Sequence, residues 1–148
     1  MNDWLNNPVF QIYSLSCLVL CANLLFLWAY SGAKRGGTKT TPNAEDVALF
    51  RGVRTELDPE PVARVLRAHR NAEALIYPFL LLGLVFVMAG GTRGVAALLF
   101  GTFTVARLLH SFAYLKGLQP WRTLFFAISG LATVALLLDI GWLMLRAG

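Results

Sequence analysis

Hydrophobic residues gather into four long runs that are separated by polar stretches. The runs cover residues 9–30, 72–89, 95–115 and 123–145. An α-helix rises about 1.5 Å per residue, so about 20 apolar residues cross the roughly 30 Å hydrocarbon core of a bilayer. We therefore predict four transmembrane helices. They should alternate in direction and form an all-α, antiparallel four-helix bundle.

The composition agrees with an integral membrane protein of one domain, residues 1–148. Of these residues 57% are hydrophobic and 14% are charged, which is far from an average soluble protein. The flank before residue 9 has no Lys or Arg and the first run is long for a cleaved signal peptide, so we expect a mature helix. Cys17 and Cys21 lie one turn apart in it without His or carboxylate neighbours, which predicts packing residues and no metal site.

Basic residues are concentrated in one part of the chain. The net charge is +5, and eight of the thirteen Lys and Arg residues lie between positions 34 and 70. By the positive-inside rule, the loop of residues 31–66 faces the cytoplasm, together with the turn that holds Lys116 and Arg122. Both termini are then expected outside. Since these cations do not cover a soluble face, the charge does not indicate nucleic-acid binding.

Polar residues recur at helical spacing inside two of the predicted spans. Positions i, i+3, i+4 and i+7 share one helix face. The second span groups Arg67, Arg70, Asn71 and Ala74, and the third groups Arg107, His110 or Ser111, and Tyr114. Arg107 lies about 18 Å by helix rise from the outer end of its span. A guanidinium at that depth is costly in lipid, so it should face the bundle interior or a subunit interface and be paired.

Two interpretations of these polar residues stay open. In the first, Arg67 anchors a helix end at the lipid headgroups, Arg122 enforces topology and His110 is a packed polar residue. In the second, arginines from several helices converge on an anion. The second is favoured because the nearest acids, Glu73 and Asp46, are too few to neutralise that many cations.

Ordered motifs in three of the four spans resemble one membrane family. The sequence "RAHRN" (67–71) is followed by "IYPF" (76–79), and "RLLHSFAYL" (107–115) is followed by "PWRT" (120–123). These motifs are similar to the MAPEG family, the membrane-associated proteins in eicosanoid and glutathione metabolism, and most of all to its prostaglandin E synthases. The likeness extends from Gly32 through "NAEDV" (43–47) to Trp142.

The resemblance implies a homotrimer in membrane lipid, with glutathione bound between neighbouring subunits and the active site toward the cytoplasm. It implies a glutathione-binding set of Arg35, Arg67, Arg70, Asn71, Glu73, Arg107, His110, Tyr114 and Phe126. Arg122 and Thr123 would stand beside the thiol, and Asp46 would assist proton transfer. Three positions depart from the family pattern: Ala74 replaces a glutamate, with Glu73 one residue earlier, Thr123 replaces a serine, and Phe126 replaces a tyrosine. The turn between Tyr114 and Arg122 is also one residue shorter than in the family.

The chemistry that the resemblance implies depends on the thiol. A free thiol has a pKa of about 8.5, so a cation or a hydrogen-bond donor is needed to keep it ionised at neutral pH. Arg122 and Thr123 would supply these two contacts. We expect a glutathione-dependent transferase or peroxidase that acts on lipophilic electrophiles, with isomerisation of a prostaglandin endoperoxide as a further activity. The alternative is a non-catalytic lipid-binding scaffold of the same family.

Overall fold

The computed structural model describes residues 3–147, and nearly all of them are helical. The elements in chain order are α1 (Asp3–Asn6), α2 (Pro8–Thr38), β1 (Thr40–Thr41), α3 (Ala44–Phe50), β2 (Val53–Arg54), α4 (Glu60–Met88), α5 (Arg93–Lys116) and α6 (Trp121–Ala147). Four of these helices, α2, α4, α5 and α6, are long and apolar enough to cross a membrane. Each of the four predicted apolar runs therefore corresponds to one of these helices.

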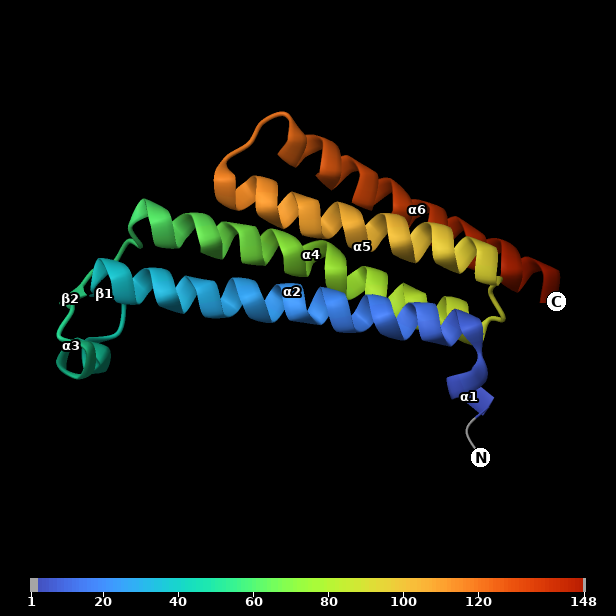
Figure 1. Ribbon diagram of the computed structural model, residues 1–148, viewed down its shortest axis with the longest axis horizontal. Helices are drawn as coiled ribbons and strands as arrows, with labels where there is room; N and C mark the ends of the chain where they lie inside the picture. The colour runs from blue at the N-terminus through green and yellow to red at the C-terminus, as the bar shows by residue number, and fades with distance from the viewer. Residues whose placement is uncertain (1–2, 148) are drawn as a thin grey trace.

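The four long helices alternate in direction and form the predicted antiparallel bundle (Figure 1). Helix α2 packs against α4 and α5, and α6 packs against α5 and α4. The segment between α2 and α4 and the turn between α5 and α6 lie toward the same end of the bundle (Figure 1), which we call the loop end. Helix α1 and the last residues of α6 lie at the opposite end. The two basic connections thus share one side, as the charge pattern predicts.

Aromatic rings fill the core of the bundle and small residues let the helices approach. The rings of Phe79 and Phe103 stack with centroids 3.6 Å apart, and Phe100 meets Phe79 edge-on. A Cβ atom at Gly83 would lie 2.9 Å from the ring of Tyr13, so a larger residue would push α2 away from α4. Many large apolar side chains point outward instead, as expected for a surface that faces lipid or other subunits.

Helix α2 is longer than the sequence predicts. The first helix was expected to end at residue 30, with Gly36 in the loop, but the helix continues to Thr38. Lys39 then takes a left-handed conformation (φ 50°, ψ 40°) and its N–H bonds the Arg35 carbonyl. Each helical glycine costs only about 1 kcal/mol, which a long helix already anchored by packing tolerates. With α4 beginning at Glu60, the predicted loop of residues 31–66 shrinks to residues 39–59.

The shortened loop is itself folded. Strands β1 and β2 pair in parallel, with Thr40 opposite Val53 and Thr41 opposite Arg54. The pairing brings the chain so close at Gly52 that a Cβ atom there would lie 2.8 Å from the carbonyl oxygen of Lys39. Only glycine fits such a close approach to backbone. The loop therefore holds a defined position beside the end of α2.

Candidate functional site

Arg107 is the buried centre of a group of polar side chains between α4, α5 and α6. Its side chain has no exposed surface, and its Nη2 donates a hydrogen bond to Oδ1 of Asn71 at 3.0 Å. Its guanidinium carbon lies 5.9 Å from the ring centroid of Phe126. The Nε and Nη1 groups have no partner among residues 3–147. A buried cation with two free donor groups is poorly compensated by the chain itself.

His110 connects α5 to the first turn of α6. Its Nδ1 lies 2.9 Å from the carbonyl oxygen of Arg122. Because a carbonyl can only accept, Nδ1 carries the proton. In the neutral ring Nε2 is then an acceptor, and it has no partner within the described chain. The ring packs between Tyr114 and Phe126, with centroids 5.7 and 5.9 Å away.

Arg122 and Thr123 are held by Gln119, a residue that the sequence analysis missed. The guanidinium of Arg122 lies over the ring of Tyr114, 4.8 Å from its centroid. The amide of Gln119 satisfies both neighbours in one orientation: its oxygen accepts from Nη2 and Nε of Arg122 at 2.7 and 3.2 Å, and its nitrogen donates to Oγ1 of Thr123 at 3.1 Å. The spacing of three and four residues between Gln119 and its partners was the available signal.

We call the group of Asn71, Arg107, His110, Tyr114 and Arg122 the polar layer. It joins residues from α4, α5 and α6, all of them predicted from the sequence. A second buried contact supports it from α2, where Nδ2 of Asn23 donates to Oγ of Ser111 at 3.1 Å. Asn23 has no polar residue three or four positions away, so its role was not visible in the sequence.

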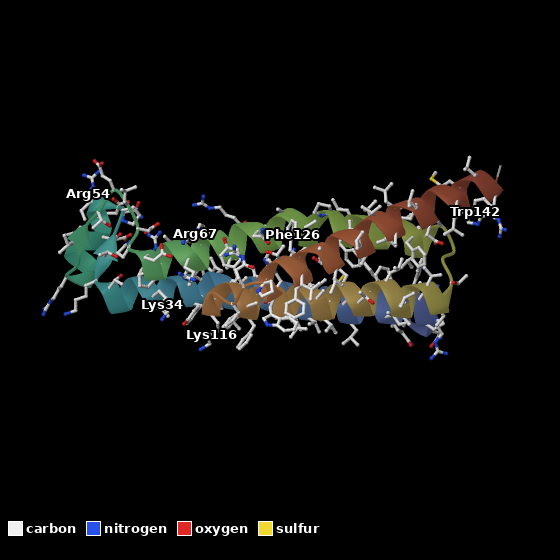
Figure 2. All side chains as sticks on the ribbon, turned by 90° about the horizontal axis from the view of Figure 1, so that it is seen from above. Lys34, Arg54, Arg67, Lys116, Phe126 and Trp142 are labelled. Atoms are coloured by element: carbon white, nitrogen blue, oxygen red, sulfur yellow. The ribbon has the colours of Figure 1, made fainter. Side chains whose placement is uncertain are left out.

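Two predicted arginines are neutralised by acids that the sequence analysis overlooked. Arg67 lies 2.9 Å from Oε1 of Glu60, and Arg35 lies 3.0 Å from Oδ1 of Asp58. The interpretation that local acids are too few is therefore wrong for these two cations. Figure 2 shows Arg67 on the part of α4 nearer the loop end, whereas Trp142 lies toward the opposite end. In contrast, Arg70 is exposed and has no partner among residues 3–147.

The two acids assigned to the site lie apart from the polar layer. Glu73 lies 3.5 Å from Nδ1 of His69 and accepts a hydrogen bond from Tyr77 at 3.0 Å, so in this chain it does not replace the missing glutamate beside Arg107. Asp46 accepts from Thr41 at 3.2 Å. It sits in α3 at the loop end and, within the described residues, makes no contact with Arg122.

A cavity of about 360 Å³ lies where the end of α2 meets the folded loop. Its lining includes Arg35, Lys39 and Asp46, together with the hydroxyls of Thr40 and Thr41. Thus Arg35 and Asp46, two residues of the predicted set, line the same cavity. This cavity is separate from the polar layer. The predicted residues are therefore divided between two places within a single chain.

The arrangement defines a four-helix integral membrane protein with a cationic polar layer between three of its helices, in which Arg107 is buried and Arg122 is half-buried. Residues 13–142 match the MAPEG family, and the chain belongs to this family. It is 36% identical to prostaglandin E synthase from Equus caballus over 135 residues, which cover 87% of this chain and 88% of that protein. It is 35% identical to prostaglandin E synthase from Homo sapiens over 135 residues, covering 87% and 89%.

A relative with a different name matches the same region. The chain is 32% identical to microsomal glutathione S-transferase 1 from Rattus norvegicus over 136 residues, which cover 86% of each protein. The family match of residues 13–142 contains the whole polar layer and the loop-end cavity. The resemblance identified from the sequence motifs is therefore confirmed at the level of the family.

Proposed function

We propose that the protein is a glutathione-dependent membrane enzyme that acts on lipophilic electrophiles as a transferase or peroxidase, with isomerisation of a lipid endoperoxide as a related activity. The names of its relatives, prostaglandin E synthase and glutathione S-transferase, support the class. The observation that carries the proposal is that three arginines are not neutralised by an acid within the described residues. Arg70, Arg107 and Arg122, on three successive long helices, have no acid partner among residues 3–147.

The donors and acceptors of the polar layer fit glutathione by their chemistry. Glutathione has two carboxylates, which pair well with guanidinium groups, often through two parallel hydrogen bonds. Nε and Nη1 of Arg107 lack a partner among residues 3–147, but the side chain has no exposed surface, so the surrounding helices would have to open for such a contact. The exposed Arg70 has its whole guanidinium available. The acceptor Nε2 of His110 suits an N–H of the ligand. Arg35 and Arg67 would exchange their present acids for the ligand or bind it jointly with them.

The predicted homotrimer belongs to the same proposal. Arg70 and Thr123 are exposed in the single chain and Phe126 is 43% exposed, so part of the proposed site is open to a neighbouring copy. Asp46 would act on a proton only if a neighbouring subunit brought it near Arg122, because in its own chain it lines the loop-end cavity. A lipophilic substrate would reach the site through the bilayer, with the loop end toward the cytoplasm.

The residues at the start of α6 would control the thiol. Bound glutathione would supply the thiolate that attacks a carbon or a peroxide oxygen. Arg122 holds a positive charge that its neutral partners, Gln119 and the ring of Tyr114, leave uncancelled. Thr123 holds a hydroxyl that can donate to sulfur. In a site shielded from water, such a charge stabilises an anion more strongly than it would in solution.

A comparison of Arg122→Ala with Arg122→Lys tests this role. The ultraviolet absorbance of the thiolate, measured on purified protein saturated with glutathione at neutral pH, should be lost in the Ala variant and largely kept in the Lys variant. Calorimetry should show that both variants still bind glutathione. An Ala variant with the absorbance of the unmodified protein would refute the role of Arg122. Binding without ionisation, and without activity toward an aromatic halide or a lipid hydroperoxide, would favour the lipid-binding scaffold.

A further inference from the structure

We propose that Gln119 is a positioning residue that sets how readily the bound thiol ionises. It would do so by fixing the Arg122 guanidinium and by turning the hydroxyl proton of Thr123 toward the ligand. The inference rests on the proposed function, because it concerns the same thiol. It adds a residue outside the sequence motifs, since "PWRT" begins one position after Gln119.

Gln119 holds the guanidinium of Arg122 in one orientation. The Gln119 oxygen accepts from Nη2 at 2.7 Å and from Nε at 3.2 Å, so it holds one edge of the planar guanidinium at two points. The ring of Tyr114 covers the guanidinium, with its centroid 4.8 Å from Cζ. The edge with Nη1 is left free. An amide thus orients the charge without cancelling it.

Gln119 also determines where the hydroxyl proton of Thr123 can point. A hydroxyl has one proton to donate and two lone pairs that accept. The Gln119 nitrogen lies 3.1 Å from Oγ1 of Thr123 and can only donate. Oγ1 therefore accepts, and its own proton stays available for another acceptor such as sulfur. The opposite amide orientation would point N–H groups at the N–H groups of Arg122, so the arginine fixes the amide and the amide fixes the hydroxyl.

A carboxylate at position 119 would reverse both effects. Glutamate has nearly the same size as glutamine but only accepts when ionised. It would form an ion pair with Arg122 and would also accept the hydroxyl proton of Thr123. Both groups would then be withdrawn from the thiol. The bond from His110 to the Arg122 carbonyl does not involve the Gln119 side chain, so the start of α6 keeps its anchor.

The experiment compares the full-length protein with Gln119→Glu and Gln119→Leu. Each is purified, saturated with glutathione as judged by calorimetry, and titrated with pH while the thiolate absorbance is recorded. We expect the midpoint to rise by about one pH unit in the Glu variant, a tenfold lower ratio of thiolate to thiol at a fixed pH, and by less in the Leu variant. Gln11→Glu, an exposed substitution in α2 near the opposite end, controls for the added charge and should leave the midpoint unchanged.

The outcomes separate this inference from the proposed function. A Glu variant that is folded by circular dichroism, binds glutathione and titrates like the unmodified protein would overturn the role of Gln119 alone. An unmodified protein that shows no thiolate at neutral pH would overturn the proposed function and this inference with it. If the Glu variant does not fold, the Leu variant decides, because it removes both hydrogen bonds without adding charge. An unchanged midpoint there would also refute the role.

Discussion

The arginines that pair with acids and those of the polar layer carry the same charge but have different partners. At the loop end, Arg35 and Arg67 each face a carboxylate, and both pairs are partly exposed to solvent. In the polar layer, Arg107 bonds the amide of Asn71, and Arg122 contacts an amide and an aromatic ring. The partners in the layer are neutral, so its positive charge is not cancelled.

This difference separates cations that stabilise the fold from cations that are free to bind an anion. An exposed ion pair contributes about 0–1 kcal/mol and is weakened by salt. A buried guanidinium with neutral partners keeps its field in a medium of low dielectric, where it attracts an anion strongly. The number of arginines is thus a poor guide to an anion site, and the identity of their partners is a better one.

The largest effect on glutathione binding is expected when the buried charge of Arg107 is removed and the volume of its side chain is kept. Arg107→Met should weaken glutathione binding roughly 100-fold, about 2.8 kcal/mol, because it removes charge-assisted hydrogen bonds and leaves an apolar side chain of similar length. Isothermal calorimetry on the purified protein measures this. Arg93→Met, a change of the same kind at the start of α5 near the opposite end, is the control. Equal affinity for the Arg107 variant and the control would show that the layer does not bind the ligand.

The next test compares a free cation with a paired one on the same helix. Arg70→Ala should raise the glutathione dissociation constant roughly 30-fold, about 2 kcal/mol, because a carboxylate contact is lost. Arg67→Ala should have a smaller effect, since Arg67 already bonds Glu60. Calorimetry of the two variants side by side gives the ratio. A larger effect at Arg67 than at Arg70 would invert the comparison.

The membrane helices could be predicted because their signal is long and local. Each apolar run has about the length that a bilayer requires, and helical spacing alone grouped Arg107 with His110 and Tyr114. The layer was therefore predictable as soon as two helices were known to pack. On α4 the same spacing grouped Asn71, which accepts a hydrogen bond from Arg107, with Arg67 and Arg70. These features depend on periodicity, which is present in the sequence itself.

The features that were missed depend on contacts without a local pattern. Asp58 and Arg35 are 23 residues apart and meet only because the loop folds back on α2. Glu60 lies two helical turns before Arg67, a distance that only long side chains bridge. The end of α2 was placed at residue 30, where the apolar run ends, but the helix continues through Gly36 to Thr38. Gln119 is the exception, because its partners lie three and four residues away, but it precedes the start of α6 and helical spacing was not applied to it.

A smaller effect is expected on stability at Asn71, which accepts a hydrogen bond from Arg107. Asn71→Leu should destabilise the protein without ligand by roughly 1 to 2 kcal/mol, because a further donor of the buried guanidinium is left unpaired. Thermal unfolding in detergent, followed by circular dichroism, reports the loss. Asn71→Asp is the matched variant: it should restore stability but weaken glutathione binding, because its carboxylate occupies Arg107. Weaker stability and unchanged binding in Asn71→Asp would argue against this competition.

The smallest effect on glutathione binding is expected when the carboxylate partner of Arg67 is removed. Glu60→Gln removes the carboxylate from Arg64 and Arg67 and so turns paired cations into free ones. Because all three side chains are well exposed, the gain in glutathione affinity should stay below about 1 kcal/mol, or roughly fivefold. It should shrink as salt is added, since exposed charges are screened. Calorimetry at low and high ionic strength measures the gain in affinity and its dependence on salt. Weaker binding in Glu60→Gln at low salt would mean that the ion pair itself positions Arg67, and that pairing does not compete with the ligand.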